Sequence, residues 1–480
     1  MQGNDEIRFY LFDTIQLKAR KSMEILIPRT IGEILHRLSE SGYEAYAVGG
    51  CVRDSLLGLS PHDWDIATSA LPEETERVFS DRHVLQTGLK HGTVTVMCGK
   101  MPVEVTTFRV DGAYSDSRHP DEVCFTPNLR EDLARRDFTV NAMAYHPESG
   151  LVDCYGGLND LKSGTIRCVG DPDKRYREDG LRILRALRFA SVLSFSIESR
   201  TAESALQNRE LIDRISAERV REEFVRLLCG QSAADVLRNY REIIAQFIPE
   251  IQPSFEFDQH SPYHSFDVWE HTLHSIAAVD AEPVLRLTMF FHDIGKPYCF
   301  TQGPDGKGHF YGHPVKSAEL TEQILTRLRF DKKTSKTVLA LVRSHDLPFS
   351  PDERCLRRRL SRLGVINLRL LLRVEEADAK GKGPAGERYL KTLRLIPEFL
   401  DRVLKEGQCF RLSSLAVDGN DLLKAGIPDG SEVGKTLSLL LNAVLDGKCG
   451  NTKRELMDYL RKEGNVVEQS GDASASTDFR

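Results

Sequence analysis

The spacing of hydrophobic and polar positions predicts that the first part of the chain mixes helices with strands. Apolar residues recur at helical spacing over residues 31–38, between a proline and a glycine, which predicts a helix. A short apolar run at residues 46–48 predicts a strand that follows it. Residues 93–97 and 103–108 are β-rich runs joined by a glycine turn, which predicts a further pair of strands.

Further along the chain the hydrophobic spacing becomes helical. Leucines three residues apart predict a helix within residues 174–189, and an amphipathic helix begins near Ser216. Residues 354–373 repeat arginines between leucines, the usual pattern of a helix with a solvated face. Residues 111–127 are polar and rich in turn formers, which predicts a mobile loop. We therefore predict an α+β fold in which a small mixed sheet with its helices is followed by an all-helical region.

Length and composition limit the class of protein. The chain has 480 residues, enough for several domains, and is 40% hydrophobic and 28% charged, as ordinary globular proteins are. Its ten cysteines include no Cys-x-x-Cys pair, which argues against a zinc ribbon and suits a reducing cytoplasm. No apolar run is long enough to span a membrane, and the first residues lack the layout of a signal peptide. The net charge of −6 means that an RNA partner would need a local basic surface.

A pair of glycines, Gly49 and Gly50, follows the strand predicted at residues 46–48, and an amphipathic segment begins near Val52. Strand, glycine turn and helix start form a geometry that holds phosphates, because glycine admits a close approach and the helix N-terminus offers free N–H groups. Arg53 is in the first turn, where its guanidinium could add bidentate contacts to a phosphate. A glycine pair alone is more often an ordinary turn.

Two carboxylates, Asp63 and Asp65, flank Trp64 shortly after the glycine pair. On a strand, alternate residues project to the same side, so the two carboxylates would repel each other unless a divalent cation lay between them. Mg²⁺ ions held in this way serve in-line phosphoryl or nucleotidyl transfer. An Asp-x-Asp sequence alone is usually a solvated loop, but its position after the glycine turn predicts a site for a nucleoside triphosphate.

The sequence Gly49-Gly50-x-x-Arg53-Asp54 followed by Asp63-x-Asp65 resembles the opening motif of the class II tRNA nucleotidyltransferase and bacterial poly(A) polymerase family. This resemblance implies that Glu104, within a strand similar to the family's, is a third catalytic carboxylate beside Asp63 and Asp65. An exposed strand residue is the alternative for Glu104.

Residues 135–142 closely resemble the second motif of the same family. Two arginines beside an aspartate at the start of a helix could pair with phosphate and ribose hydroxyls. The resemblance therefore implies that Arg136 and Asp137 bind the nucleotide. A surface cluster of ion pairs is the alternative.

Asp179 and Arg182 lie three residues apart in the helix predicted within residues 174–189. Such a pair is most often a weak intrahelical ion pair. In the family that the chain resembles, the pair acts as a protein template for the incoming base. A carboxylate accepts a hydrogen bond from the amino group of cytosine or adenine while a guanidinium donates to the ring nitrogen, so uracil and guanine are rejected. Arg185 and Arg188 are expected to reach the triphosphate.

A histidine pattern begins near residue 264, where the sequence resembles the HD phosphohydrolase family. The resemblance implies a metal site formed by His271, His292, Asp293 and Asp346. Imidazole and carboxylate groups suit a divalent transition metal or Mg²⁺. The presence of the site does not establish its activity, because the same fold can carry silent sites.

Together these features identify the chain as a member of the tRNA nucleotidyltransferase family and predict an enzyme that adds C and A to the 3′ end of tRNA. CTP, ATP and Mg²⁺ are the expected substrates and cofactor, with a second divalent metal in the HD region. A poly(A) polymerase, or an enzyme that adds only CC or only A, would carry nearly the same motifs, and an HD phosphohydrolase is an alternative of another class. The expected division is a nucleotidyltransferase head at 28–155, a helical neck at 156–250, an HD domain at 260–380, a helical body at 381–465 and a disordered tail at 466–480.

Overall fold

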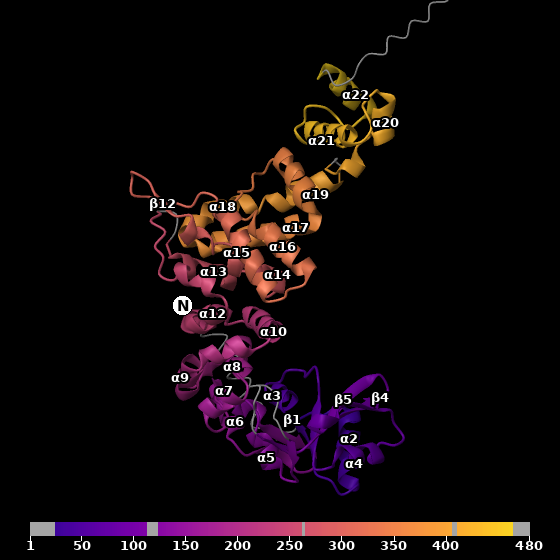
Figure 1. The fold of residues 1–480 in the computed structure, drawn as a ribbon, viewed down its shortest axis with the longest axis vertical. Helices are drawn as coiled ribbons and strands as arrows, with labels where there is room; N and C mark the ends of the chain where they lie inside the picture. Colours follow the sequence, from indigo (N-terminus) through magenta and orange to yellow (C-terminus); the bar gives the residue numbers. More distant parts are fainter. Residues whose placement is uncertain (1–24, 113–122, 262–264, 406–409, 464–480) are drawn as a thin grey trace, which may run out of the picture. The chain divides into compact units, whose positions relative to one another are not determined.

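The computed structural model describes residues 25–112, 123–261, 265–405 and 410–463. The tail expected at 466–480 and the middle of the loop expected at 111–127 lie outside these residues. The chain forms two compact units. The first comprises the chain up to Phe255 with residues 281–287 and 323–331, and the second comprises residues 256–280, 288–322 and the chain from Lys332 onward. Figure 1 shows the sheet in the indigo, N-terminal part of the first unit and helices in the rest of it.

A seven-stranded mixed sheet forms the N-terminal head, as the sequence predicts. The pairing of β2 with β5 is parallel and the other pairings in the sheet are antiparallel. A separate two-stranded pair, β6 with β7, lies at the two ends of the expected loop. In sheet order the strands are β3 (Val84–Gly88), β4 (Thr93–Cys98), β5 (Met101–Thr107), β2 (Asp65–Thr68), β1 (Ala45–Val48), β8 (Met143–His146) and β9 (Gly150–Asp153), and the separate pair is β6 (Arg109–Asp111) with β7 (Val123–Phe125).

Helix α2 (Arg29–Glu40) covers part of this sheet because its apolar positions fall on one face. Its four buried side chains pack in one cluster with residues of the sheet, among them Ile66 and Val94. Helix α4 (Pro72–Val78) begins with proline at its first position, where the missing N–H group is not needed. The helix that the sequence predicts at residues 31–38 is confirmed as α2.

A glycine at the start of α6 (Gly157–Ser163) fixes how closely the head packs at this point. A methyl group on Gly157 would overlap the Thr139 carbonyl oxygen and lie 2.8 Å from its carbon and 2.9 Å from a side-chain carbon of Met143. Backbone cannot move aside cheaply in a packed core.

We expect Gly157→Ala to lower the free energy of unfolding by about 1–3 kcal/mol because of this overlap. Gly32→Ala is the matched control, since Gly32 lies inside α2 with open space around it. The control should raise stability by about 0.5–1 kcal/mol, because alanine favours helix interiors. Urea unfolding of both variants measures the difference, and equal effects of the two substitutions would contradict the packing argument.

The helical neck follows the head within the first unit, and one break in it differs from the sequence prediction. The helix expected over residues 174–189 is two helices separated at Asp179 and Gly180. A side chain on Gly180 would lie 2.9 Å from the Leu211 carbonyl oxygen, so the chain turns here against a neighbouring segment. The neck helices are α7 (Pro172–Glu178), α8 (Leu181–Leu193), α9 (Ser199–Gln207), α10 (Ala217–Leu228), α11 (Ala233–Asn239) and α12 (Arg241–Phe247).

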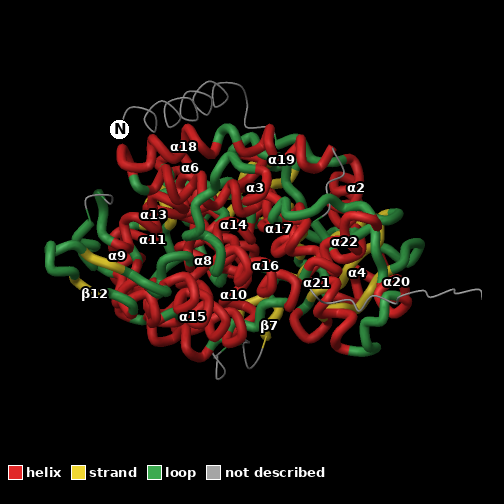
Figure 2. Tube along the Cα trace, turned by 90° about the horizontal axis from the view of Figure 1, so that it is seen from above, coloured by secondary structure: helices red, strands yellow, loops and turns green. Residues whose placement is uncertain are grey.

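The chain after the neck is almost entirely helical (Figure 2). A short hairpin of β12 (Thr301–Gln302) and β13 (Gly308–His309) interrupts it. The longest helix bends at Gly364, where φ is 74°. The helices are α13 (Val268–Ala278), α14 (Pro283–Phe291), α15 (His313–Arg327), α16 (Lys332–Val342), α17 (Glu353–Gly381), α18 (Glu387–Leu393), α19 (Ile396–Lys405), α20 (Gly419–Lys424), α21 (Ser431–Leu445) and α22 (Lys453–Lys462).

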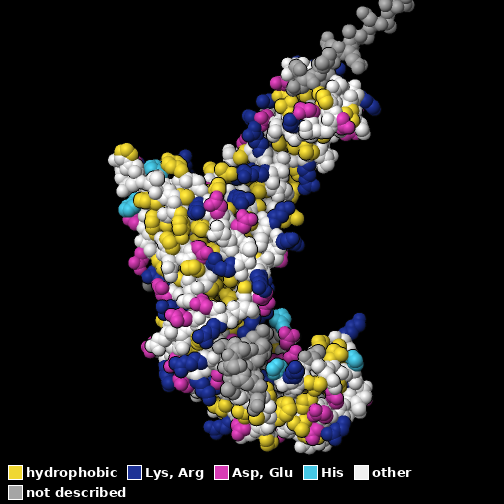
Figure 3. All heavy atoms as spheres, in the orientation of Figure 1, with side chains coloured by type: hydrophobic (Ala, Val, Ile, Leu, Met, Phe, Trp, Pro, Cys, Tyr) yellow, Lys and Arg dark blue, Asp and Glu magenta, His cyan; other side chains and the backbone are white. Residues whose placement is uncertain are grey.

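Acidic and basic side chains are interspersed over the face of the molecule drawn in Figure 3. Several arginines of α17 form exposed ion pairs, including Arg358 with Asp446 and Arg369 with Asp401. Exposed pairs of this kind contribute little to stability. In the described parts of the chain, no helix combines the length and hydrophobicity that crossing a membrane requires.

Candidate functional site

The glycine turn after β1 is tightly packed against an arginine. Gly49 has φ of 80°, and a side-chain carbon there would lie 2.9 Å from Arg136 Nη1. Glycine is therefore needed for both the backbone conformation and the close approach. Arg136 Nε is buried without a hydrogen-bond partner among the described residues, as expected of a group that an absent ligand would satisfy.

Arg53 lies on α3 (Gly50–Leu56), directly after the turn, and its side chain is held in one position. Its Nη1 donates to Asn141 Oδ1 at 2.6 Å, and its Nε donates to Asp54 Oδ1 at 2.8 Å. Its guanidinium carbon lies 4.9 Å from the centre of the Phe189 ring. The sequence analysis did not identify Asn141 or Phe189 as supports of this arginine.

The three predicted carboxylates lie on or directly before two neighbouring strands in the middle of the sheet, β2 and β5. Asp65 begins β2 and is the register partner of Glu104 on the parallel strand β5. Asp63 precedes β2, so the expectation that Asp63 and Asp65 alternate on one strand is wrong in detail. Burial raises the pKa of Glu104, and Asp65 and Asp63 raise it further.

Burial also raises the pKa of Asp65, while the charge of Arg136 opposes the rise and that of Asp63 adds to it. The charges of Asp63 and Asp65 therefore act on Glu104 and on one another, and the charge of Arg136 acts on Asp65. Oxygen donors of this kind fit Mg²⁺, which would relieve the repulsion.

Asp137 is buried in a set of hydrogen bonds that keep it ionised. Its Oδ1 accepts from the Phe138 N–H at 2.8 Å and from Asn141 Nδ2 at 3.0 Å. Its Oδ2 accepts from Arg185 Nη2 at 2.6 Å. Burial alone would raise the pKa of Asp137, but Arg185 and these donors hold it well below its usual range.

The chain around Asp137 does not begin a helix, contrary to the sequence prediction for residues 135–142. Helix α5 (Leu129–Ala134) ends before it, and a short 3₁₀ turn at Thr139–Asn141 follows it. Arg136 and Asp137 therefore lie in a connection that runs past the glycine turn. Their proposed contacts with phosphate and ribose cannot depend on a helix N-terminus.

Asp179 and Arg182 are each held by residues from other segments or the preceding turn. Asp179 accepts from Arg219 Nη2 at 2.7 Å and from the Leu181 N–H at 3.0 Å. Arg182 donates to Glu178 Oε2 at 2.6 Å and to the Arg135 carbonyl oxygen at 3.1 Å. The helix breaks at Asp179, so the two residues do not share one continuous helix as the residue spacing suggested.

Helix α10 supplies two residues that the sequence analysis did not single out. Arg219 holds Asp179, and Glu223 Oε2 lies 2.6 Å from Arg188 Nε. The guanidinium carbon of Arg188 also lies 3.8 Å from the centre of the Phe189 ring. Burial lowers the pKa of Arg188 to about 10, although Glu223 opposes this effect. The spacing of Arg219 and Glu223 on one helical face was the available sequence signal.

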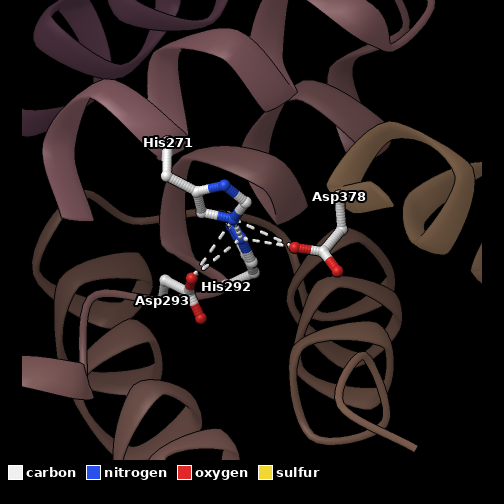
Figure 4. A group of neighbouring side chains, drawn as sticks. All are labelled: His271, His292, Asp293 and Asp378. Atoms are coloured by element: carbon white, nitrogen blue, oxygen red, sulfur yellow. Dashed lines mark hydrogen bonds and ion pairs between the residues drawn. The ribbon is translucent and has the colours of Figure 1, made fainter. Parts of the chain in front are cut away.

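A second cluster of ionisable side chains lies in the HD region (Figure 4). His271 on α13, His292 and Asp293 after α14, and Asp378 on α17 converge, with donor atoms within 4.8 Å of one another. His271 Nε2 lies 3.0 Å from Asp378 Oδ1 and 3.4 Å from Asp293 Oδ2. Buried imidazole and carboxylate groups in this arrangement fit a divalent transition metal.

Asp346, predicted as the fourth ligand of this site, lies outside the cluster. Its side chain is 58% exposed, and its Oδ2 lies 4.0 Å from His313 Nδ1. Asp378 takes the predicted position instead, because α17 brings it into contact with α13. Its only sequence signal was an acidic residue between two alanines of a long helical segment.

The charges of this cluster are strongly coupled. Burial alone would lower the pKa of His292, but Asp293 and Asp378 raise it to about 9. Burial would raise the pKa of Asp378, but Lys382 and His271 hold it well below its usual range. A divalent cation bound among these side chains would balance the negative charge of Asp293 and Asp378.

Comparisons with known proteins match most of the chain. Residues 45–167 match the family model described as the Poly A polymerase head domain. Residues 194–255 match the "Probable RNA and SrmB- binding site of polymerase A", and residues 263–378 match the HD domain.

Individual relatives extend this match over nearly the whole chain. The CCA-adding enzyme of Lactobacillus helveticus is 34% identical over 89% of this chain and 95% of its own length. The CCA-adding enzyme of Lactobacillus delbrueckii subsp. bulgaricus is 35% identical over 89% of this chain and 96% of its own length. The structure of the Bacillus stearothermophilus CCA-adding enzyme with CTP is 29% identical, has a TM-score of 0.66 and covers 91% of this chain and 99% of that one. The structure of the Thermotoga maritima CCA-adding enzyme with tRNA shares the fold, with a TM-score of 0.59 at 20% identity. It covers 92% of this chain and 97% of that one.

Proposed function

This chain belongs to the family of CCA-adding enzymes, and we propose that it adds C and A residues to the 3′ end of tRNA from CTP and ATP, with release of pyrophosphate. The observation that carries this proposal lies in the middle of the head sheet, where Asp65 on β2 and Glu104 on β5 are register partners, with Arg136 acting on Asp65 and packed against the Gly49 turn. A phosphate cradle next to coupled carboxylates is the arrangement that nucleotidyl transfer requires.

In this proposal Asp63 and Asp65 hold Mg²⁺, with Glu104 as the third carboxylate. The bound metal would supply Lewis-acid stabilisation of the charge that develops on the reacting phosphate. Arg136 then lies where it can bind the triphosphate, since its buried Nε lacks a partner among the described residues. The other groups proposed to hold the triphosphate and sugar are Gly49, Gly50, Arg53, Asp137, Arg185 and Arg188.

Asp179 and Arg182 are proposed to select the base. Asp179 is fixed by Arg219 and Arg182 by Glu178, so neither needs the other to hold its position. A fixed carboxylate accepts a hydrogen bond from the amino group of cytosine or adenine, and a fixed guanidinium donates to the adjacent ring nitrogen. A carbonyl in place of the amino group faces the carboxylate lone pairs, which disfavours uracil and guanine.

The proposal places the head at residues 28–155, the neck at 156–250, the HD domain at 260–380 and the C-terminal body at 381–465. It places the enzyme in the cytoplasm, where tRNA is processed and where the nine described cysteines, all unpaired, would stay reduced. The arginines of α17 are candidates for contacts with the tRNA backbone.

The decisive experiment supplies CTP and ATP singly and together to a tRNA that lacks its 3′ end, with product lengths read at single-nucleotide resolution. A complete CCA end that forms only with both nucleotides supports the proposal. Long A tails would identify a poly(A) polymerase, and CC alone or A alone would identify a partial adding activity.

The HD cluster favours a second function, hydrolysis of phosphate esters, because buried histidines and aspartates converge there. We expect His292→Ala to lower the metal content of the purified protein by one transition-metal ion and to abolish any phosphohydrolase activity, because the Nε2 ligand is lost. Nucleotide addition should stay within about twofold of wild type, because His292 is not part of the head that carries the nucleotidyltransferase site.

His274→Ala is the matched control, since His274 is exposed on the same helix as His271. Elemental analysis and addition assays on both variants measure the two outcomes. A His292→Ala protein with unchanged metal content would show that no metal binds in this cluster.

A further inference from the structure

Phe189, on the neck helix α8, lies among three of the arginines proposed to hold the triphosphate. The guanidinium carbon of Arg188 lies 3.8 Å from the centre of its ring, that of Arg53 lies 4.9 Å from it, and that of Arg185 lies 5.4 Å from it. Arg185 and Arg188 precede Phe189 on the same helix, whereas Arg53 comes from α3, directly after the glycine turn. One ring therefore gathers cationic groups from the head and from the neck.

The ring of Phe189 is fixed by close packing. Only 4% of the residue is exposed, and the ring of Phe138 meets it edge-on, with ring centres 5.8 Å apart and ring planes at 81°. Phe138 is itself fully buried and follows Asp137, the partner of Arg185. A closely packed side chain keeps one rotamer, so the ring offers the arginines a fixed surface.

The three arginines carry like charges that disfavour one another. Burial lowers the pKa of Arg188, and the charge of Arg185 adds to this effect, although Glu223 opposes it. Each guanidinium has a carboxylate partner at 2.6 or 2.7 Å: Arg53 with Asp54, Arg185 with Asp137, and Arg188 with Glu223. A carboxylate fixes a guanidinium, but it also occupies N–H groups and offsets the charge that a phosphate would use.

An aromatic ring fixes a guanidinium in a different way. Its face attracts a cation through the ring quadrupole, and it leaves the charge and the remaining N–H donors in place for a phosphate. We propose that Phe189 is a positioning residue for the triphosphate, whose ring holds the three arginines as a preformed anion-binding set. A set that is ordered before the ligand arrives spares the free energy of ordering it on binding.

This role rests on the proposed function, nucleotide addition at the head site. The ring acts on groups that are proposed to hold phosphates, whereas Asp179 and Arg182 are proposed to select the base. Loss of the ring of Phe189 should therefore weaken binding of CTP and ATP alike. It should leave the preference for CTP over UTP unchanged.

The experiment measures kcat and KM for CTP and for ATP with the full chain. Leucine keeps an apolar side chain but has no aromatic face, so KM for each nucleotide should rise about tenfold in Phe189→Leu, while kcat changes much less. The inhibition constant of pyrophosphate should rise by the same factor, because pyrophosphate carries phosphates without a base. Phe189→Tyr keeps the aromatic face and should stay close to wild type in all three measurements.

A second replacement separates electrostatic attraction from packing. Pentafluorophenylalanine in place of Phe189 nearly keeps the size and shape of the ring but reverses its quadrupole, so the ring face no longer attracts cations. KM for both nucleotides should rise at least as much as in Phe189→Leu, while urea unfolding stays close to that of wild type. An unchanged KM in this protein would overturn the proposal.

Phe79→Leu is the matched control. Phe79 is fully buried in the head, and the guanidinium carbons of Arg37 and Arg82 lie 4.7 and 5.8 Å from its ring centre. It loses the same kind of contact outside the nucleotide site, so stability should fall while KM for CTP and ATP stays unchanged. A rise in KM as large as that of Phe189→Leu would mean that lost packing is the cause, and would overturn the proposal. A wild-type chain that adds no nucleotide would contradict the proposed function itself, whereas an active wild type with the same KM as Phe189→Leu would contradict only the role of the ring.

Discussion

Asp65→Ala is expected to abolish addition of both C and A, with a fall in rate of about a thousandfold or more, because metal ligation supplies several kcal/mol of transition-state stabilisation. Asp65 is the carboxylate most closely tied to the site, since it is the register partner of Glu104 and lies near Arg136. Binding of tRNA should change little, because phosphate contacts elsewhere supply most of the affinity for a nucleic acid.

Glu148→Ala provides a matched control, since Glu148 is an exposed carboxylate in the turn between β8 and β9. Single-turnover addition and filter binding of tRNA measure the two effects separately. Near-normal turnover of the Asp65→Ala enzyme in Mg²⁺ would refute the assignment of the head carboxylates. Weak tRNA binding by the same variant would instead indicate that the substitution disturbed the fold.

Local sequence patterns predicted the elements around the head site well. A strand, two glycines and a helix start are neighbours in the chain, so their geometry depends on backbone conformations that the residues themselves dictate, as the positive φ of Gly49 shows. The meeting of Asp65 with Glu104 is different, because it depends on the pairing of β2 with β5. Resemblance to a known family supplied that expectation, and periodicity could not have supplied it.

The errors arose where distant segments decide a residue's position. Asp346 follows His345 directly in the sequence and was predicted as the fourth ligand, but its side chain is largely exposed. Asp378 joins the cluster instead, because it lies on α17, a long helix that begins at Glu353. Similarly, helical spacing placed Asp179 and Arg182 on one face of one helix. The chain instead leaves the helix at Asp179, whose backbone is extended, and Gly180 packs against Leu211. No pattern within residues 174–189 records this contact.

Asp179→Ala is expected to raise incorporation of UTP relative to CTP by about a hundredfold, while overall addition slows. Sites built to hydrogen-bond a substrate group discriminate by several orders of magnitude, because a wrong substrate leaves buried polar groups unpaired. Loss of the carboxylate removes the acceptor that favours an amino group and repels a carbonyl. Competition between CTP and UTP on one tRNA measures the ratio directly.

Asp171→Ala is the matched control for base choice. Asp171 lies in the same part of the neck and forms an exposed ion pair with Arg200 at 3.1 Å. Its loss should cost about 1 kcal/mol or less in stability and leave the CTP-to-UTP ratio unchanged. If Asp179 were only the partner of Arg219, Asp179→Ala would behave as this control does.

Arg219→Ala distinguishes a positioned carboxylate from one that merely lies nearby. Arg219 donates to both oxygens of Asp179, at 2.7 Å and 3.4 Å, from a different helix. Without it Asp179 keeps its charge but loses its orientation, so the CTP-to-UTP ratio should fall, though less than in Asp179→Ala. Arg219→Lys restores the charge without the planar guanidinium and should recover only part of the ratio. An unchanged ratio in Asp179→Ala would place the template elsewhere, whereas an unchanged ratio in Arg219→Ala alone would mean that Arg182 and the backbone suffice to orient the base.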